Sequence, residues 1–398
     1  MNTRSLTEHS PDYHERAVFP QGYTCASRNV GLKPEAKDLS VFLSSVPAEA
    51  AAVFTRNRFP GAPVILGRET IRRGRLQAIV VNSKVSNVGT GEQGLLNARR
   101  MTVAAAAELG VRADEVLVSS TGVIGKQLPI DLIERGMVGI ANELQSDPLV
   151  GAEGIMTTDT FPKAFSARVG NAVITWIAKG AGMIEPNMAT MLSWIFTDAK
   201  IEAATLDRLL REAVDVSFNM LSVDTDTSTS DTCAILANGL AGEVDEAEFA
   251  RVLRAGSIRM AETIAHDGEG ATKLLRATVE GAATRDQART AARAIINSPL
   301  IKTMAFGADP NVGRVLMAVG KCFDVEQDPA LTEVLINGIR VFGDGSRPDY
   351  DEAALRVLLA GDPVEIHVAL GKGDHSATAF GCDLTHGYID ENAAYYSS

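Results

Sequence analysis

Short apolar runs rich in β-branched residues alternate along this chain with alanine-rich segments that have helical spacing. One such series is Leu76–Val81, then Leu95–Leu109, then Val116–Val118. Strand-like and helix-like segments that alternate in this way are typical of an α/β or α+β protein with a mixed sheet. Because the chain has 398 residues, it can form one large domain or two to three smaller ones.

The pattern changes near residue 285, which predicts a domain boundary there. Arg285–Ile296 has helical spacing, and short apolar runs flank Asn337-Gly338 as in a β-hairpin. The run 364–370 alternates strictly, so we expect one set of side chains to face a core: Val364, Ile366, Val368 and Leu370. We therefore expect an α/β core over residues 1–285, with residues 1–16 as a loose polar tail, and a smaller α+β domain over residues 286–398.

Charge and hydropathy exclude several classes of partner. The net charge of −12 argues against nucleic acid and against an anionic membrane surface, since both need clustered Lys and Arg. The longest stretch without a charged residue, 186–197, is shorter than the roughly 20 apolar residues of a membrane helix. Residues 1–16 lack the apolar core of a secretory signal, so we expect a cytoplasmic protein that acts on small molecules.

Two other kinds of site are disfavoured by their context. Gly89–Gly94 has the glycine spacing of a dinucleotide fingerprint, but seven residues separate it from the preceding strand and no acid ends the next strand, so we interpret it as a turn and helix cap. The six histidines show no metal-ligand spacing, and the four cysteines are scattered. We therefore predict no metal site and reduced, buried thiols.

The segment Lys179–Leu192 is the most informative for chemistry. Its glycines and Pro186 indicate a loop that leads into an apolar strand, and Thr190 lies at that junction. A threonine becomes a useful nucleophile when a base is adjacent, and cleavage of the Ala189-Thr190 bond would free the α-amine of Thr190 to act as that base. Taken alone, the segment favours a threonine that simply opens a strand, because single threonines at strand starts are common.

A set of short motifs is spread over nearly the whole chain. They are Val53–Phe59, Ser120–Gly125, Met156–Thr160, Lys179–Leu192, Asp226–Thr229, Asp267–Gly270, Asp309–Asn311 and Asn392. Together they resemble the ornithine acetyltransferase (glutamate N-acetyltransferase) family, whose members cut themselves at an Ala-Thr bond and use the freed threonine as nucleophile. The resemblance implies an α/β sandwich of N-terminal-nucleophile type, made of residues 1–189 and 190–398 as two chains.

The same resemblance implies a role for individual residues. Thr121 and Gly122 match the oxyanion pair, Thr157, Lys179 and Glu269 match substrate-binding positions together with Thr190, and Asn392 and Ser397 match tail positions that close the site. The implied reaction moves acetyl from N-acetyl-L-ornithine to L-glutamate through an acetyl-Thr190 ester, in a ping-pong mechanism without cofactor or metal. The implied assembly is an α2β2 heterotetramer or larger.

This sequence also departs from the family pattern. Val312 stands where many relatives have Trp, Thr225 stands where Gly is usual, the segment 82–86 lacks a usual glycine, and Ser398 extends the tail. Several departures resemble the branch found beside antibiotic pathways, which leaves the natural substrate open. The alternatives are a self-processed acyltransferase or amidohydrolase for another N-acyl amino acid, an acetyltransferase that uses acetyl-CoA, and a binding protein whose Thr190 never cleaves.

Overall fold

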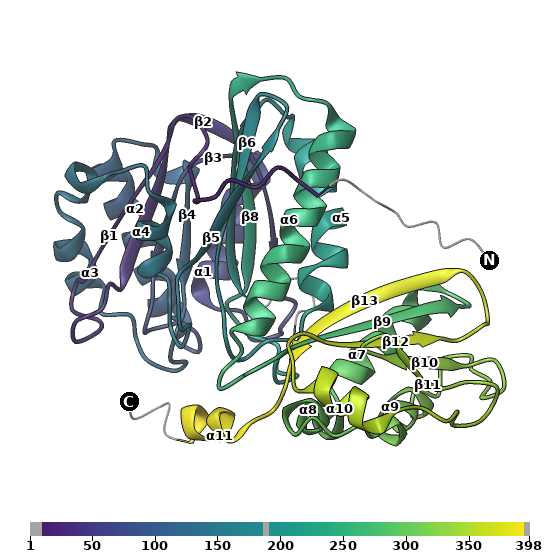
Figure 1. The fold of residues 1–398 in the computed structure, drawn as a ribbon. Helices are drawn as coiled ribbons and strands as arrows, with labels where there is room; N and C mark the ends of the chain where they lie inside the picture. The colour runs from purple at the N-terminus through teal and green to yellow at the C-terminus, as the bar shows by residue number, and fades with distance from the viewer. Residues whose placement is uncertain (1–9, 186–190, 394–398) are drawn as a thin grey trace.

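The computed structural model describes residues 10–185 and 191–393, which form two sheets with helices packed on them (Figure 1). The first sheet has the strand order β4-β3-β2-β8-β7-β6-β5, and β1 pairs with β2. Its strands are β1 Tyr23–Arg28, β2 Leu39–Phe54, β3 Arg75–Asn82, β4 Val116–Ser120, β5 Lys163–Val169, β6 Ala172–Lys179, β7 Leu192–Ala199 and β8 Thr232–Gly242. The second sheet has the order β11-β10-β12-β9-β13, with β9 Leu274–Ala282, β10 Glu333–Ile336, β11 Ile339–Phe342, β12 Val364–Ala369 and β13 His375–Cys382.

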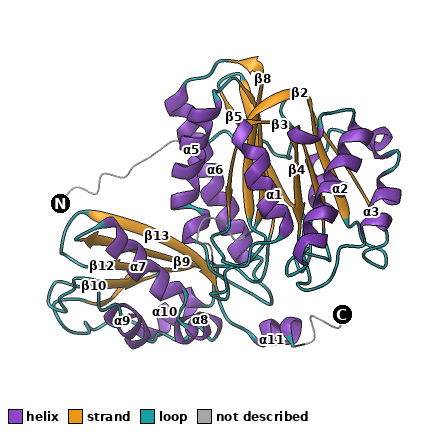
Figure 2. Cartoon of the chain, turned by 180° about the vertical axis from the view of Figure 1, so that it is seen from behind, coloured by secondary structure: helices purple, strands orange, loops and turns teal. Residues whose placement is uncertain are grey.

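Helices pack on both sheets, and the last helix of the chain lies apart from them (Figures 1 and 2). Those with the first sheet are α1 Ala62–Thr70, α2 Gly91–Leu109, α3 Ile130–Met137, α4 Pro148–Glu153, α5 Ala203–Val216 and α6 Glu246–His266. Those that follow are α7 Arg285–Ile296, α8 Pro299–Phe306, α9 Val312–Gly320, α10 Glu352–Leu359 and α11 His386–Asn392. Short 3₁₀ turns occupy Ile71–Arg73, Ala113–Glu115, Ile140–Glu143 and Phe218–Met220. The mixed α/β architecture predicted from the sequence is confirmed.

Strand alternation divides the core of the first sheet between its two faces. On β7, Ile195 packs in the cluster that α5 and α6 cover, while Trp194 and Phe196 on the opposite face belong to a different cluster. A third cluster lies under α2 and α3, where Val80 of β3 meets apolar residues of these helices. Because successive side chains of a strand point to opposite faces, both faces of the sheet are apolar and buried.

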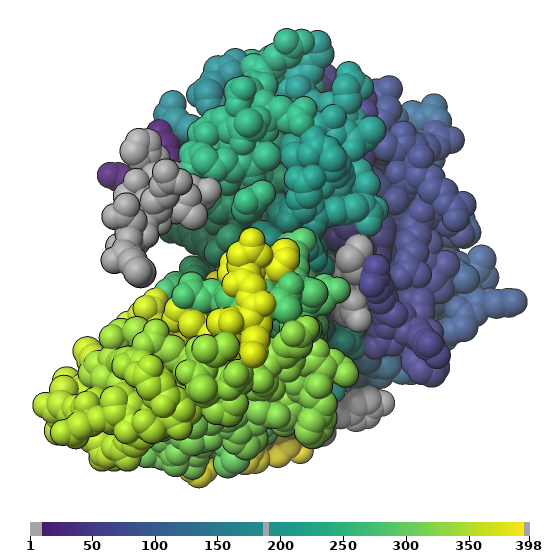
Figure 3. Space-filling view, turned by 90° about the vertical axis from the view of Figure 1, so that its right-hand side faces the viewer, coloured from purple at the N-terminus to yellow at the C-terminus, as the bar shows by residue number. Residues whose placement is uncertain are grey.

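The second sheet begins earlier in the chain than the predicted boundary. Strand β9 precedes residue 285, yet it lies between β12 and β13, and its pairing with β12 is parallel. The cluster beneath α5 and α6 continues without a break into the second sheet and α7, so the two sheets share apolar core. The division of the chain into domains at residue 285 therefore stays a prediction, while the change of sheet comes before Leu274. Figure 3 shows the yellow-green residues of the second sheet as a lobe against the teal and green residues of the first.

Several local predictions for the second sheet are confirmed. Helix α7 spans the predicted residues, β10 and β11 flank Asn337-Gly338 as an antiparallel hairpin, and the inward set predicted from the alternation of β12 is buried.

Two predictions made for other parts of the chain are also confirmed. Gly89–Gly94 forms a turn and the start of α2, with Thr90 at the N-cap position. All four cysteines are free and buried.

The predicted loose tail is wrong for the part that the structure describes. Residues 1–9 lie outside the described residues, but Tyr13 forms a β-bridge with Ala167 of β5 and its ring packs edge-on against Phe165 at 5.7 Å between centroids. The His14 N–H also donates to the Ser166 carbonyl over 2.9 Å. The polar composition of residues 1–16 gives no signal of this contact, because a single aromatic ring can pack a segment that is otherwise polar.

Candidate active site

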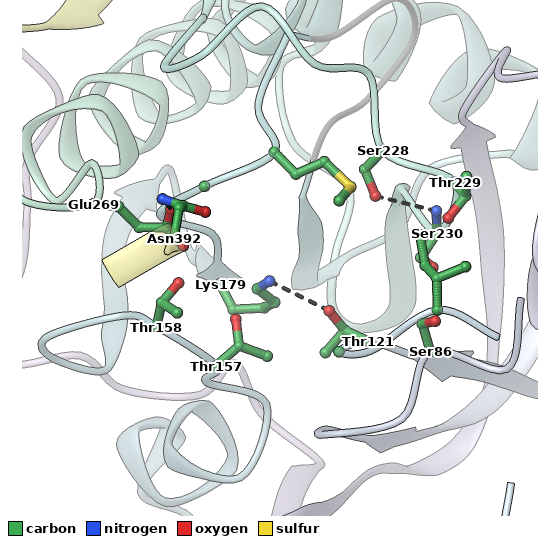
Figure 4. Close-up of a pocket in the computed structure, with 14 residues that line it drawn as sticks. Ser86, Thr121, Thr157, Thr158, Lys179, Ser228, Thr229, Ser230, Glu269 and Asn392 are labelled. Atoms are coloured by element: carbon green, nitrogen blue, oxygen red, sulfur yellow. Dashed lines mark hydrogen bonds between the residues drawn. The ribbon is translucent and has the colours of Figure 1, made fainter. Parts of the chain in front are cut away.

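Most of the predicted site residues line one cavity at the end of the first sheet where β3, β4 and β6 finish. Thr121, Gly122, Thr157, Lys179, Glu269 and Asn392 all border a cavity of about 100 Å³ (Figure 4). The other residues that line it are Ser86, Ile124, Thr158, Gly182, Met183, Ser228, Thr229 and Ser230. The remaining predicted site residues, Ala189, Thr190 and Ser397, lie outside the described residues.

A tight turn after β4 holds Thr121 and Gly122. Gly122 has φ +124°, and a Cβ there would lie 2.2 Å from the carbonyl carbon of Lys84, so the turn requires glycine. Among residues 10–185 and 191–393, no acceptor is bonded to the Gly122 N–H. A backbone N–H left free at the wall of a cavity is suited to bind an oxyanion.

Lys179, the last residue of β6, supplies a buried positive charge. Its side chain donates to the Thr121 hydroxyl oxygen over 3.3 Å, and the residue is only 8% exposed. Burial lowers the pKa of Lys179, and the neighbouring carboxylates of Asp159, Asp231 and Glu269 offset part of that shift. A desolvated ammonium in a cavity favours a carboxylate ligand.

Glu269 and Asn392 meet at the opposite wall, where α11 brings the end of the chain to the cavity. The Asn392 Nδ2 donates to Glu269 Oε2 over 2.7 Å. A Cβ on Gly182 would lie 2.2 Å from the same Glu269 oxygen, so a larger residue there would displace the carboxylate. Helix α11 rests on the loop after α6, because Gly270 and Gly387 are in close backbone contact. The structure thus places Asn392 at the cavity, and its role in closing the site stays a prediction.

The chain is fixed on both sides of residues 186–190. On the first side, the Asp224 carboxylate accepts from the Met183 and Ile184 N–H groups at 2.6 and 2.8 Å. On the other side, the Thr232 N–H donates to the Met191 carbonyl over 3.0 Å. The run Asp224–Thr232 therefore anchors both flanks of the Ala189-Thr190 bond.

The same run contains a residue in a left-handed conformation and a buried carboxyl group. Thr225 adopts φ +69°, a left-handed conformation that is unfavourable for a β-branched residue. Asp231 is 2% exposed, and its Oδ2 has no hydrogen-bond partner within the described parts of the chain. Burial raises the pKa of Asp231 well above its usual range, although a hydrogen bond with Ser228 and the charge of Lys179 act in the other direction.

The structure adds a wall of hydroxyl groups to the site, formed by Ser228, Thr229 and Ser230 opposite Lys179 (Figure 4). The density of Ser, Thr and Asp in this run was the available signal. Over the described ranges, no cluster of three or more His, Cys, Asp or Glu side chains is placed to hold a metal ion. No helix in these ranges is long and apolar enough to cross a bilayer.

Comparison with known proteins agrees with the resemblance seen in the motifs. Residues 24–397 match the ArgJ family. The chain is 46% identical over 379 residues to the arginine biosynthesis bifunctional protein ArgJ 2 of a Nostoc species, covering 94% of this chain and 97% of the relative. It is 43% identical over 385 residues to the glutamate N-acetyltransferase Oat2 of Streptomyces clavuligerus, covering 94% and 98%.

A solved structure of the arginine biosynthesis bifunctional protein ArgJ from Bacillus halodurans superposes with a TM-score of 0.50 at 36% identity. The match covers 52% of the present chain and 100% of the solved chain. Family match, relatives and fold agree, and the chain belongs to the ArgJ family of acyltransferases.

Proposed function

We propose that this protein transfers acetyl from N-acetyl-L-ornithine to L-glutamate through an ester on Thr190, after cutting itself between Ala189 and Thr190. The observation that carries the proposal is one cavity that combines the Gly122 N–H, which has no acceptor among the described residues, with the buried Lys179 and Glu269 side chains. The names of the relatives, arginine biosynthesis bifunctional protein and glutamate N-acetyltransferase, support the same reaction.

The self-cleavage follows from covalent adjacency. The Thr190 hydroxyl oxygen attacks the Ala189 carbonyl carbon, the C–N bond breaks as its nitrogen takes the proton, and an ester links the two residues. Water then hydrolyses the ester and leaves a carboxylate on Ala189 and a free amine and hydroxyl on Thr190. The anchoring of the segments before residue 186 and after residue 190 by Asp224–Thr232 supports this step, since it holds the described chain in place on either side of the bond. About half of the present chain, 52%, covers the whole of the solved Bacillus halodurans chain. A relative's chain of that length also supports a two-chain product.

Acetyl transfer then uses the same groups twice. The Thr190 oxygen attacks the amide carbon of N-acetylornithine while the Thr190 α-amine takes the hydroxyl proton. The negative charge on the amide oxygen is stabilised by the Gly122 N–H and the Thr121 hydroxyl. Collapse passes the proton to the leaving amine of ornithine and leaves acetyl on Thr190. The neutral amine of glutamate attacks this ester, and the Thr190 α-amine takes the proton from the attacking nitrogen. The amine then passes this proton to the leaving Thr190 oxygen, which releases N-acetylglutamate and restores the hydroxyl.

The charged walls fit the proposed substrates. N-acetylornithine carries a carboxylate, for which Lys179 is the partner, and an ammonium, for which Glu269 is the partner. Thr157 and Asn392 add a hydroxyl and an amide beside these charges, and Ser397 is proposed to add a second hydroxyl from the tail. The reaction needs no cofactor. The free, buried cysteines support a reducing compartment such as the cytoplasm.

Intact-mass spectrometry tests the proposal directly. Wild-type protein should appear as residues 1–189 and 190–398 without added protease, and Thr190→Ala should stay whole. Mixed with N-acetylornithine alone, the 190–398 chain should gain one acetyl group, which glutamate then removes as N-acetylglutamate. Full-length wild-type protein after prolonged incubation would contradict the processing.

Two further results would point to the alternatives. Rapid release of free acetate without glutamate would favour the amidohydrolase, and acetylation of the chain by acetyl-CoA would extend the range of donors. Light scattering of the purified protein tests the proposed α2β2 assembly, because it separates that mass from the 42.2 kDa of one precursor.

A further inference from the structure

A buried cluster of charges lies beside the cavity without lining it. The Lys163 side chain, at the start of β5, is fully buried, and its Nζ lies 2.6 Å from Asp159 Oδ1 and 2.5 Å from Asp267 Oδ2. Both carboxylates are also buried, with side chains 0% and 3% exposed. Burying three charges is costly, and replacing such groups by apolar ones is often neutral or stabilising. Stability alone therefore gives no reason for this cluster.

Asp159 connects the cluster to two segments that carry predicted substrate-binding residues. Its Oδ2 accepts from the Thr157 N–H over 2.9 Å, and its Oδ1 accepts from the Gly180 N–H over 2.7 Å. Thr157 lines the cavity, and Gly180 directly follows Lys179. One carboxylate therefore fixes the backbone at both positions.

Asp267 connects the cluster to the third segment. It accepts from the Thr160 N–H over 3.1 Å and from the Thr160 hydroxyl, in addition to Lys163. It lies two residues before Glu269, whose N–H donates to the Ala181 carbonyl over 2.9 Å. The loop after α6 is thereby tied both to the segment of Thr157 and to the segment of Lys179.

We propose that Asp159, Lys163 and Asp267 form a positioning network that sets the relative places of Thr157, Lys179 and Glu269 in the substrate pocket. None of the three lines the cavity, so they act through the residues that do. The inference rests on the proposed function, because it takes those three residues as the ones that hold the substrate. Charge-assisted hydrogen bonds of this kind hold backbone groups more firmly than neutral ones.

The network also acts on the charge of Lys179. The charged groups around Lys179 are the carboxylates Asp159, Asp231 and Glu269 and the ammonium groups of Lys163 and Lys33. Burial lowers the pKa of Lys179, and Asp159 is the largest influence that raises it. Loss of the Asp159 charge should therefore lower the pKa of Lys179 further, so that the ammonium loses its proton at a lower pH.

Asp159→Asn tests the network, with Asp198→Asn as the matched control. Asp198 is also a buried carboxylate, 4% exposed, and accepts from the Gln21 and Val173 N–H groups at 2.9 and 2.8 Å. It belongs to β7 and lies beside the start of β6, whereas Lys179 ends β6. For Asp159→Asn we expect the KM for N-acetylornithine to rise at least about tenfold, with a smaller fall in kcat. We also expect the alkaline limb of kcat/KM to move to lower pH, and the control to leave both unchanged.

A milder variant and a second readout complete the test. Thr160→Val removes only the hydroxyl bond to Asp267 and should give a smaller rise in KM, even if Asp159→Asn folds poorly. The ¹³Cε resonance of Lys179, assigned with Lys179→Arg, should titrate at lower pH in Asp159→Asn than in wild type. This shift does not depend on turnover, so it separates failure of the network from failure of the proposed reaction.

The possible results divide clearly. An unchanged KM and an unchanged Lys179 titration in Asp159→Asn would overturn the network, as would activity that falls only in proportion to the folded fraction. An equal change in the Asp198→Asn control would also overturn it, since the effect would then be one of general stability. A wild-type protein without acetyl transfer would refute the proposed function, and the Lys179 titration would still decide the network.

Discussion

The Lys179 ammonium donates to the hydroxyl oxygen of Thr121 over 3.3 Å at the wall of the cavity. Because Lys179 can only donate, the Thr121 hydroxyl must accept in this contact, and its own hydrogen is free to point to another acceptor. Lys179 is the proposed partner of the substrate carboxylate, and Thr121 is a proposed oxyanion donor. Their contact therefore lets Lys179 orient the Thr121 hydroxyl.

Thr121→Ala should reduce kcat by roughly 10² to 10³ while KM changes little, since the hydroxyl bonds to charge that develops only in the transition state. Thr121→Ser is the control, because it keeps the hydroxyl and should keep most of the activity. Steady-state kinetics of acetyl transfer measures both. A variant that keeps its kcat but binds the donor poorly would assign Thr121 to ground-state binding instead.

Thr225→Gly should raise the free energy of unfolding by about 1 kcal/mol. A residue with a Cβ is strained by roughly that amount at φ +69°, whereas glycine is not. Thr225→Ala keeps the Cβ and should recover less. Urea denaturation of both variants against wild type measures the difference. A loss of stability in the glycine variant would mean that Thr225 makes contacts that outweigh the strain.

Asp231→Asn should stabilise the protein more at pH 7.5 than at pH 4.5. A pKa that burial raises means that the folded state binds the proton more tightly than the unfolded state. The stability of the wild type therefore falls as the pH rises from about 4, where the unfolded carboxyl begins to ionise, and the amide abolishes this loss. Denaturation curves at both pH values check the sign. A difference between variant and wild type that does not change with pH would refute a raised pKa for the Asp231 carboxyl.

Deletion of residues 392–398 should leave the cut at Ala189-Thr190 intact and abolish acetyl transfer. The cut needs no external substrate, whereas the deletion removes Asn392 from Glu269 and Ser397 from the proposed site. Asn392→Ala is the matched point variant and should weaken transfer without stopping it. Mass spectrometry follows the cut and an assay for N-acetylglutamate follows transfer. Unchanged kinetics in the truncated protein would remove the tail from the site.

Local helices and hairpins could be predicted from the sequence better than the pairing of distant strands. The Asn337-Gly338 hairpin and α7 follow from short-range signals, and the structure confirms both. The place of β9 in the second sheet depends on pairing with strands about 90 residues later, which no local pattern encodes.

The site shows the same limit. The motifs identified the residues that line the cavity, but nothing in the sequence distinguishes Lys163 from a surface lysine. Its burial between two carboxylates, from Asp159 and Asp267, appears only when distant segments meet. The left-handed backbone of Thr225 is not signalled by threonine itself, but it agrees with the glycine that is usual at this position in the family.

The strand order of the first sheet constrains the biogenesis of the enzyme. Strands β7 and β8, which follow the Ala189-Thr190 bond, lie between β2 and β6, which precede it. Neither fragment could therefore assemble this sheet by itself, so if the chain is cut as proposed, the precursor must fold before the cut. The same interleaving means that cleavage would not separate the two polypeptides. They would stay joined by the hydrogen bonds between β2 and β8 and between β6 and β7, and only denaturation would part them.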